Sequence, residues 1–221
     1  MPPVLLLGVF ATQARICAMT AVMGLSSRLK TAKLMALVPA QEQRKLATLC
    51  DELASAGVSV VFLTAPDAES LKTAKSFSGY DALVGAFGDE DLAVDLKCDV
   101  VAHQRFPVEK PHEFALRGAA CPSEDRLAEA IDSDDVDFLI VTGALACVAQ
   151  KFAPASDASS KPWFAMTEGD DVDELIESGA KRLALFGPAV EAKQAERIWK
   201  KISAAWGPEM QRLLFTQLAQ G

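Results

Sequence analysis

Short apolar runs alternate with longer amphipathic runs along most of the chain, from residue 34 onward. The apolar runs span 34–40, 58–66, 82–88, 99–105, 114–122, 136–143, 161–169 and 181–190. Each run is long enough for one strand, and most are followed by a segment with helical spacing. Parallel strands separated by helices are buried on both faces. Eight consecutive units of this kind predict one closed (β/α)8 TIM barrel.

The polar segments carry their own evidence for helices. In the segment after the first strand, one helix face holds Leu46, Leu49, Cys50 and Leu53. These residues recur three and four positions apart, which is the spacing of a buried helix face. Gly179 is placed to end a later helix. The alternative fold is an open doubly wound sheet, but the first strand lacks the Gly-x-Gly-x-x-Gly turn that is typical of that fold.

Two units depart from this period. The segment 106–114 is short and rich in proline, which disfavours a helix. The segment 144–160 ends in a Ser/Ala/Asp stretch that is typical of a loop. We expect both on the face at which the strands end, where barrel loops carry chemistry.

The chain divides into two parts, an apolar extension over residues 1–30 and a single barrel domain over residues 31–221. The extension has no positive charge ahead of its apolar run, and Gln13 and Arg15 interrupt it. This pattern disfavours a secretory signal, which is the minor alternative, and a membrane span. It is a disordered segment, an added helix, or the product of a misassigned start with Met23 as the true one.

Composition limits the partners and the compartment. The net charge of −8 disfavours binding to nucleic acid or to an anionic membrane surface. Five scattered cysteines, with no Cys-x-x-Cys, indicate reduced thiols in a cytoplasmic protein. Two histidines are too few for a His-rich metal site. A homo-oligomer remains open.

Two glycine-bearing turns, Thr167-Glu168-Gly169 and Phe186-Gly187-Pro188, end the seventh and eighth runs. In a barrel these turns are adjacent, and their backbone amides form a common phosphate site. The alternative is that the glycines only end strands. The nearby carboxylates of Glu168, Asp170 and Asp171 would repel phosphate unless they point outward or cap the next helix, and Pro188 lacks an amide donor.

The order of segments from Leu34 to Ile202 resembles the thiamine phosphate synthase family and its thiazole-tautomerase relatives. The resemblance is carried by "GDEDLAVDLKCDVVAH", "LRGAACPSEDRLAEA", "DVDFLIVTG" and "KPWFAMTEGDDVDELIESGAKRLALFGPAV". It implies a barrel that couples an aminopyrimidine diphosphate to a thiazole phosphate with Mg²⁺. It also implies that Thr142 and Gly143 join the phosphate site.

The residues that this resemblance assigns differ from the family's own. Only Thr64 is polar where the family has Gln-Leu-Arg-x-Lys. Asp89 or Asp91 would be the metal ligand, and Arg105 or Lys110 would supply displaced positive charge. The alternative for each of the four is a solvated residue at a helix start. Ser123 and Cys121 lie near the family's serine, and Lys151 is the candidate for its mobile-loop lysine.

Residue chemistry adds three points. Cys121 is a candidate nucleophile, although a buried thiol is the alternative. His103 is a candidate acid or base near the end of the fourth strand. Lys161 and Lys181 sit at strand starts, so no strand offers the inward lysine that a Schiff-base aldolase needs.

Three functions follow: a divergent thiamine phosphate synthase-like transferase, a non-catalytic relative that binds a phosphorylated ligand or a partner, or a different phosphosugar-processing barrel. The loss of the basic residues after the second strand favours the second, and the family resemblance favours the first. In each case the expected partner is a phosphorylated small molecule.

Overall fold

A computed structural model describes residues 24–208 except 40–42, 78–81, 156 and 158. Its strands are β1 (Leu34–Pro39), β2 (Val58–Thr64), β3 (Leu83–Phe87), β4 (Val100–His103), β5 (Leu116–Cys121), β6 (Phe138–Val141), β7 (Trp163–Thr167) and β8 (Leu183–Leu185). Each strand lies within one of the apolar runs of the sequence, because β-branched and small residues fit a sheet that is buried on both faces.

The strands form one closed parallel barrel in chain order, with β8 pairing with β1. This confirms the predicted eight-stranded α/β barrel and excludes the open sheet. The end at which the strands finish is the mouth of the barrel, and the opposite end is its base. The backbone amide of Phe186 donates to the carbonyl of Thr167 at 3.1 Å, so the turns after β7 and β8 lie side by side, as predicted.

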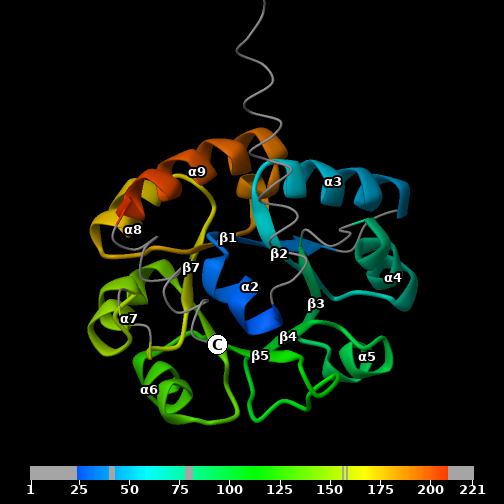
Figure 1. The fold of residues 1–221 in the computed structure, drawn as a ribbon, viewed down its shortest axis with the longest axis horizontal. Coiled ribbons are helices and arrows are strands. Elements are labelled where there is room, and N and C mark those ends of the chain that lie inside the picture. The colour runs from blue at the N-terminus through cyan, green and yellow to red at the C-terminus, as the bar shows by residue number, and fades with distance from the viewer. Residues whose placement is uncertain (1–23, 40–42, 78–81, 156, 158, 209–221) are drawn as a thin grey trace, which may run out of the picture.

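The helices are α2 (Leu25–Thr31), α3 (Gln43–Ser55), α4 (Ala68–Phe77), α5 (Glu90–Asp95), α6 (Glu124–Asp132), α7 (Ala146–Phe152), α8 (Val172–Glu177) and α9 (Ala192–Ala205), with short 3₁₀ turns η1 (Gly143–Leu145) and η2 (Gly187–Val190). Helices α3 to α9 surround the barrel, and α2 lies across one end of it (Figure 1). The predicted face of α3 is correct, since Leu46, Cys50 and Leu53 are fully buried. Gly179 follows α8 with φ +96°, as a helix end requires.

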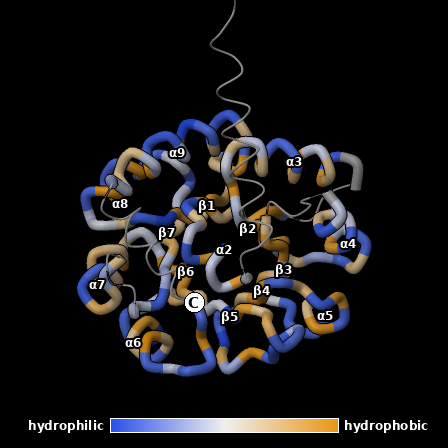
Figure 2. The backbone as a smooth tube through the Cα atoms, viewed as in Figure 1, coloured by the Kyte–Doolittle hydropathy of each residue, from blue (hydrophilic) through white to orange (hydrophobic). Residues whose placement is uncertain are grey.

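Two apolar layers hold the fold together. One fills the space between the strands and the surrounding helices. The other fills the barrel itself. There the ring centroid of Phe138 lies 6.1 Å from that of Phe62 and 6.4 Å from that of Phe164. Figure 2 shows hydrophobic positions along the strands and hydrophilic positions on the outer turns of the helices. The burial pattern therefore follows the alternation of the sequence.

Helix α2 lies across the base of the barrel (Figure 1) and buries Leu29 and Ala32 against the interior layer. It begins inside the predicted extension 1–30, so the predicted boundary divides a packed helix. The rest of that extension, residues 1–23, lies outside the described residues.

At the base, lysine and arginine side chains donate hydrogen bonds to the carbonyl groups at the ends of helices. Lys75 donates to carbonyls at the end of α5, Lys161 to carbonyls at the end of α6, and Lys181 to the carbonyl of Ala205 in α9. Arg182 donates to the carbonyl of Lys30 in α2 at 2.8 Å. Positive charge at a helix C-terminus satisfies free carbonyls and opposes the helix dipole. These side chains therefore stabilise the fold.

The segment from 104 to 115 contains no helix, as its prolines predicted. The other expectation about loops was wrong for the stretch after Phe152. That stretch connects α7 to β7, so it lies at the base and not at the mouth. The helix α7 occupies residues that we expected to approach the strand ends.

Among the described cysteines, Cys50, Cys98 and Cys121 are buried and Cys147 is exposed. No described helix combines the length and the apolar character needed to cross a bilayer.

Candidate functional site

A cavity of about 510 Å³ opens at the mouth of the barrel. It is lined by Leu37, Pro39, Thr64, Phe87, Gln104, Ala120, Cys121, Pro122, Ile140, Thr142, Met166, Phe186 and Gly187. These residues come from the ends of all eight strands or from the turns directly after them. The mouth is where barrels of this kind place their ligands.

The walls of this cavity are mostly apolar. Phe87 and Phe186 supply aromatic rings, and Ile140 and Met166 supply aliphatic surface. The polar side chains are those of Thr64, Gln104 and Thr142. A pocket with an apolar body and a few polar groups is typical of a small-molecule site.

A second cavity of about 430 Å³ adjoins the first, since both are lined by Thr142, Met166 and Phe186. Its other walls are Gly143, Ala144, Thr167, Glu168, Asp170 and Asp171. The two cavities differ sharply in charge, because three carboxylates line the second and no charged side chain lines the first.

The turn after β7 is fixed by a hydrogen-bond relay. The amide of Gly169 donates to Oγ1 of Thr167 at 2.9 Å, and that buried hydroxyl donates to Asp171. Gly187, after β8, has φ +55°, and a Cβ on it would lie 3.7 Å from the carboxylate of Glu168. The two predicted turns are therefore adjacent, but a carboxylate flanks them.

The predicted phosphate set comprised Thr142, Gly143, Glu168, Gly169, Gly187 and Pro188. The structure brings these residues to one side of the mouth, with Pro188 in η2. Phosphate binding there stays a prediction, and the three carboxylates oppose it by charge.

Cys121 lines the first cavity but is only 1% exposed. Burial raises the pKa of its thiol to about 11, and the neighbouring Arg126 only partly offsets this rise. The thiol lies 3.6 Å from the carbonyl of Ala119. A nucleophilic cysteine needs a lowered pKa, so the structure favours the structural reading of Cys121.

The other predicted residues near β4 and β5 have structural partners. Nδ1 of His103 accepts from the amide of Arg105 at 2.7 Å, and the Arg105 side chain is exposed. Ser123 caps α6 through the amide of Arg126. None of these three predicted residues lines either cavity, whereas Thr64 does.

The predicted metal ligands do not fit Mg²⁺. Oδ1 of Asp89 accepts from the amide of Leu92 at 3.0 Å and so caps α5, and Asp91 is an exposed residue in the first turn. In the described ranges, no group of three or more His, Cys, Asp or Glu side chains could hold a metal ion.

The lysine that the family resemblance assigned to a mouth loop lies elsewhere in this fold. Lys151 lies in the last turn of α7, a helix that runs toward the base, and its ammonium lies 5.3 Å from the Phe152 ring centroid. This placement does not support the predicted catalytic role. Every lysine of the sequence lies in the described ranges, and none lines either mouth cavity.

The apolar mouth residues were missed by the sequence analysis, although a signal was present. Alternate residues of a strand face the barrel interior. Extending the inward series 138–140 in β6 by one step gives Thr142, and the series 164–166 in β7 ends at Met166. The last inward position of each strand therefore predicts the cavity wall.

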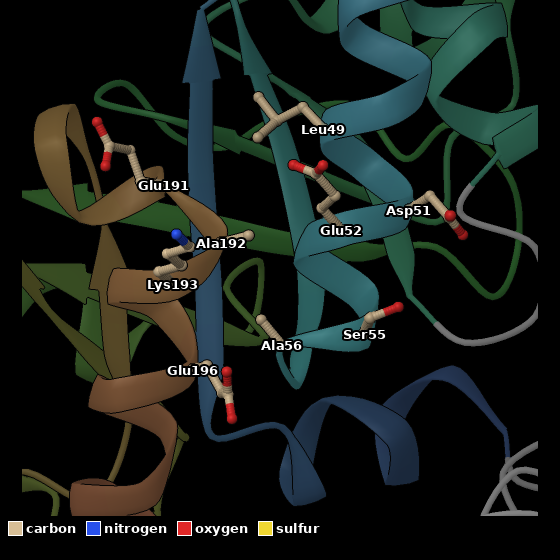
Figure 3. A pocket seen from close by; sticks show the side chains of 9 residues that line it. All are labelled: Leu49, Asp51, Glu52, Ser55, Ala56, Glu191, Ala192, Lys193 and Glu196. Atoms are coloured by element: carbon tan, nitrogen blue, oxygen red, sulfur yellow. The ribbon is translucent and has the colours of Figure 1, made fainter.

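Figure 3 shows a larger cleft, of about 660 Å³, on the outside of the barrel between α3 and α9. Its walls are Leu49, Asp51, Glu52, Ser55, Ala56, Glu191, Ala192, Lys193 and Glu196. The carboxylates here are exposed, and Glu196 pairs with Lys200 at 2.6 Å. Solvated helix faces of this kind have an ordinary structural explanation, so the candidate site is the mouth.

No protein-family profile and no curated protein match the chain. Solved structures do match it. One described as native KDPGal has 14% identity and a TM-score of 0.61, covering 78% of this chain and 95% of the other.

Two further structures are described as aldolases. A 4-hydroxy-2-oxoglutarate/2-dehydro-3-deoxyphosphogluconate aldolase has 11% identity and a TM-score of 0.59, covering 84% of this chain and 100% of the other. The 2-keto-3-deoxy-6-phosphogluconate aldolase of Zymomonas mobilis has 17% identity and a TM-score of 0.54, covering 82% and 97%. At these identities the likeness shows the fold.

These neighbours contradict the resemblance drawn from the sequence. Two of these three barrels are described as aldolases, and none of the three is described as a thiamine phosphate synthase. The assignments to thiamine biosynthesis and to a transferase are therefore wrong. The physical reason is that the rhythm of strands and small residues reports barrel packing, which many unrelated barrels share.

Proposed function

We propose that this protein binds a small molecule with an apolar body at the mouth of its barrel, without a covalent bond to a lysine. The observation that carries the proposal is the 510 Å³ cavity, whose walls are aromatic and aliphatic and hold no lysine. Its few hydroxyl and amide groups would orient a ligand, as Thr64, Gln104 and Thr142 offer both donors and acceptors.

The structural neighbours make aldol cleavage the competing function. Cleavage through a Schiff base needs a lysine inside the barrel near a strand end. The lysines before β7 and β8, Lys161 and Lys181, instead donate to helix carbonyls at the base. Metal-assisted cleavage needs a set of metal ligands, and the described residues offer no such group. The mouth chemistry thus supports binding over cleavage.

The test compares the wild type with Thr142→Phe in a ligand-observed NMR screen of small aromatic and aliphatic fragments. Thr142 lines both cavities and its side chain makes no helix-capping bond, so the larger ring fills space at little cost to folding. We expect fragments to bind the wild type and to lose binding, by about tenfold or more, to the variant. Thr73→Phe on α4 is the matched control, because Thr73 lies outside both cavities.

The competing function has its own readout. Incubation with pyruvate and borohydride, followed by mass spectrometry of the intact protein, traps a Schiff base as a stable adduct. We expect no mass increase. An adduct would overturn the proposal in favour of an aldolase, and fragments that bind Thr142→Phe as well as the wild type would show that the mouth is not the site.

A further inference from the structure

We infer that the ligand of the mouth carries a positively charged nitrogen, bound beside the turns that follow β7 and β8. The inference rests on the proposed function, because it names the ligand class of the same site. It starts from the two adjoining cavities, one apolar and one lined by carboxylates.

The two cavities together offer room for one elongated ligand. Thr142, Met166 and Phe186 line both, so the two cavities adjoin at these three side chains. An apolar body would occupy the first cavity, and its polar end would meet the second.

The charge of that second cavity has one sign. Glu168, Asp170 and Asp171 line it, and no Lys, Arg or His lines either cavity. Glu168 is exposed at the mouth and makes no hydrogen bond or ion pair within the described part of the chain. An anionic group would meet uncompensated negative charge there, and a cation would be attracted.

Helix capping does not account for the placement of Asp171. It is the N-cap residue of α8, but its side chain caps no amide of that helix and instead accepts from Thr167. Asp67 and Asp89 precede other helices and do accept from backbone amides, of Ser70 and Leu92. Asp171 is thus held against the strand end, at the rim of the cavity.

Aromatic surface adds to the preference for a cation. Phe186 lines both cavities, and Glu168 reaches the turn directly after it, beside Gly187. A quaternary or primary ammonium gains from a carboxylate and from the face of an aromatic ring at the same time. The same arrangement stabilises a neutral ligand less than a cation, and it does not stabilise an anion.

The experiment is a calorimetric titration with four probes that share an aromatic body: 2-phenylethylammonium, 2-phenylethanol, phenylacetate and phenyl phosphate. We expect affinity to fall in the order cation, neutral, anion, with the cation binding on the order of fivefold more tightly than the alcohol. The cation's advantage falls as salt is raised, because exposed charges are screened.

Variants locate the effect. In Glu168→Gln and Asp171→Asn the ratio of the affinity for the cation to the affinity for the alcohol falls by about threefold each. Asp173→Asn is the matched control, since it removes a carboxylate on the outer side of α8 that pairs with Lys201. In this control the ratio of the affinity for the cation to the affinity for the alcohol stays at its wild-type value.

The outcomes separate the two proposals. Equal affinity for cation and alcohol, or tighter binding of an anion, overturns the charge preference while leaving the mouth as the site. A cation preference that survives both variants overturns the assignment to these carboxylates. Failure of all four probes to bind the wild type overturns both the preference and the proposed function.

Discussion

The base and the mouth of this barrel use charge in opposite ways. At the base, cations meet the ends of helices: Arg182 is 4% exposed and donates to α2, and Lys181 donates to α9. At the mouth the charged side chains of the cavity walls are carboxylates. Lys181 and Arg182 thus support the fold at the end opposite the two mouth cavities.

Part of this difference follows from topology. In a parallel barrel with one helix after each strand, the helices begin at the mouth and end at the base. Helix dipoles then favour carboxylates at the mouth and cations at the base. Asp89 fits this rule because it caps α5, whereas Glu168 and Asp171 make no cap. Helix capping therefore does not explain Glu168 and Asp171, and we attribute their placement to a ligand.

The largest expected effect is at the base. Trp206 is buried, donates to the carbonyl of Lys181, and has Lys33 and Arg182 at 5.0 and 5.4 Å from its ring. We expect Trp206→Ala to lower the free energy of unfolding by about 3–5 kcal/mol, measured by urea denaturation. A loss below about 1 kcal/mol would contradict the claim that these groups at the base stabilise the fold.

Two glycines, one at the base and one at the mouth, allow the packing of the two ends to be compared directly. Gly57 at the base and Gly88 at the mouth both have positive φ, of 93° and 84°. A Cβ on Gly57 would overlap the ring of Trp199, whereas one on Gly88 meets nothing within 4 Å.

Both alanine variants therefore carry backbone strain of about 1–2 kcal/mol. Gly57→Ala carries a further cost of about 1–3 kcal/mol for the overlap. Thermal or urea unfolding of the two variants checks the difference, and equal losses would contradict the tighter packing of the base.

The smallest expected effect concerns two thiols. Burial raises the pKa of Cys98, near the base, and of Cys121, at the mouth, each to about 11. Because the folded pKa lies above the ordinary value of 9.0, burial of each neutral thiol contributes stability below pH 9 that is lost as pH rises through about 11.

We expect iodoacetamide at pH 8 to modify the exposed Cys147 and to leave Cys98 and Cys121 protected, with protection falling as pH approaches 11. Peptide mapping by mass spectrometry reads each site. Modification of Cys121 at the rate of Cys147 would show a reactive thiol at the mouth and restore its predicted role as a nucleophile.

The sequence predicted the barrel because burial on both faces of a parallel strand leaves a strong apolar signal. It also predicted the adjacent turns of Gly169 and Gly187, since their strands are consecutive. It placed Lys151 at the mouth because the family resemblance assigned this lysine to a mobile loop after the sixth strand, whereas the residue lies in α7. The helix carries that lysine toward the base.

Residue type alone does not identify the cavity walls. Ile140 and Met166 are indistinguishable from core residues by type, and only their position at the strand ends distinguishes them. The resemblance to a known family failed for a related reason. It matched small residues that fit strands against helices, and such residues carry no information about the ligand.

The most direct test of the central claim is a crystal structure of the protein soaked with 2-phenylethylammonium. The account predicts the ring against Phe186 and Ile140 inside the mouth, with its nitrogen toward Glu168 and no covalent link to the chain. A ligand seated in the cleft between α3 and α9, or bonded to a lysine, would contradict it.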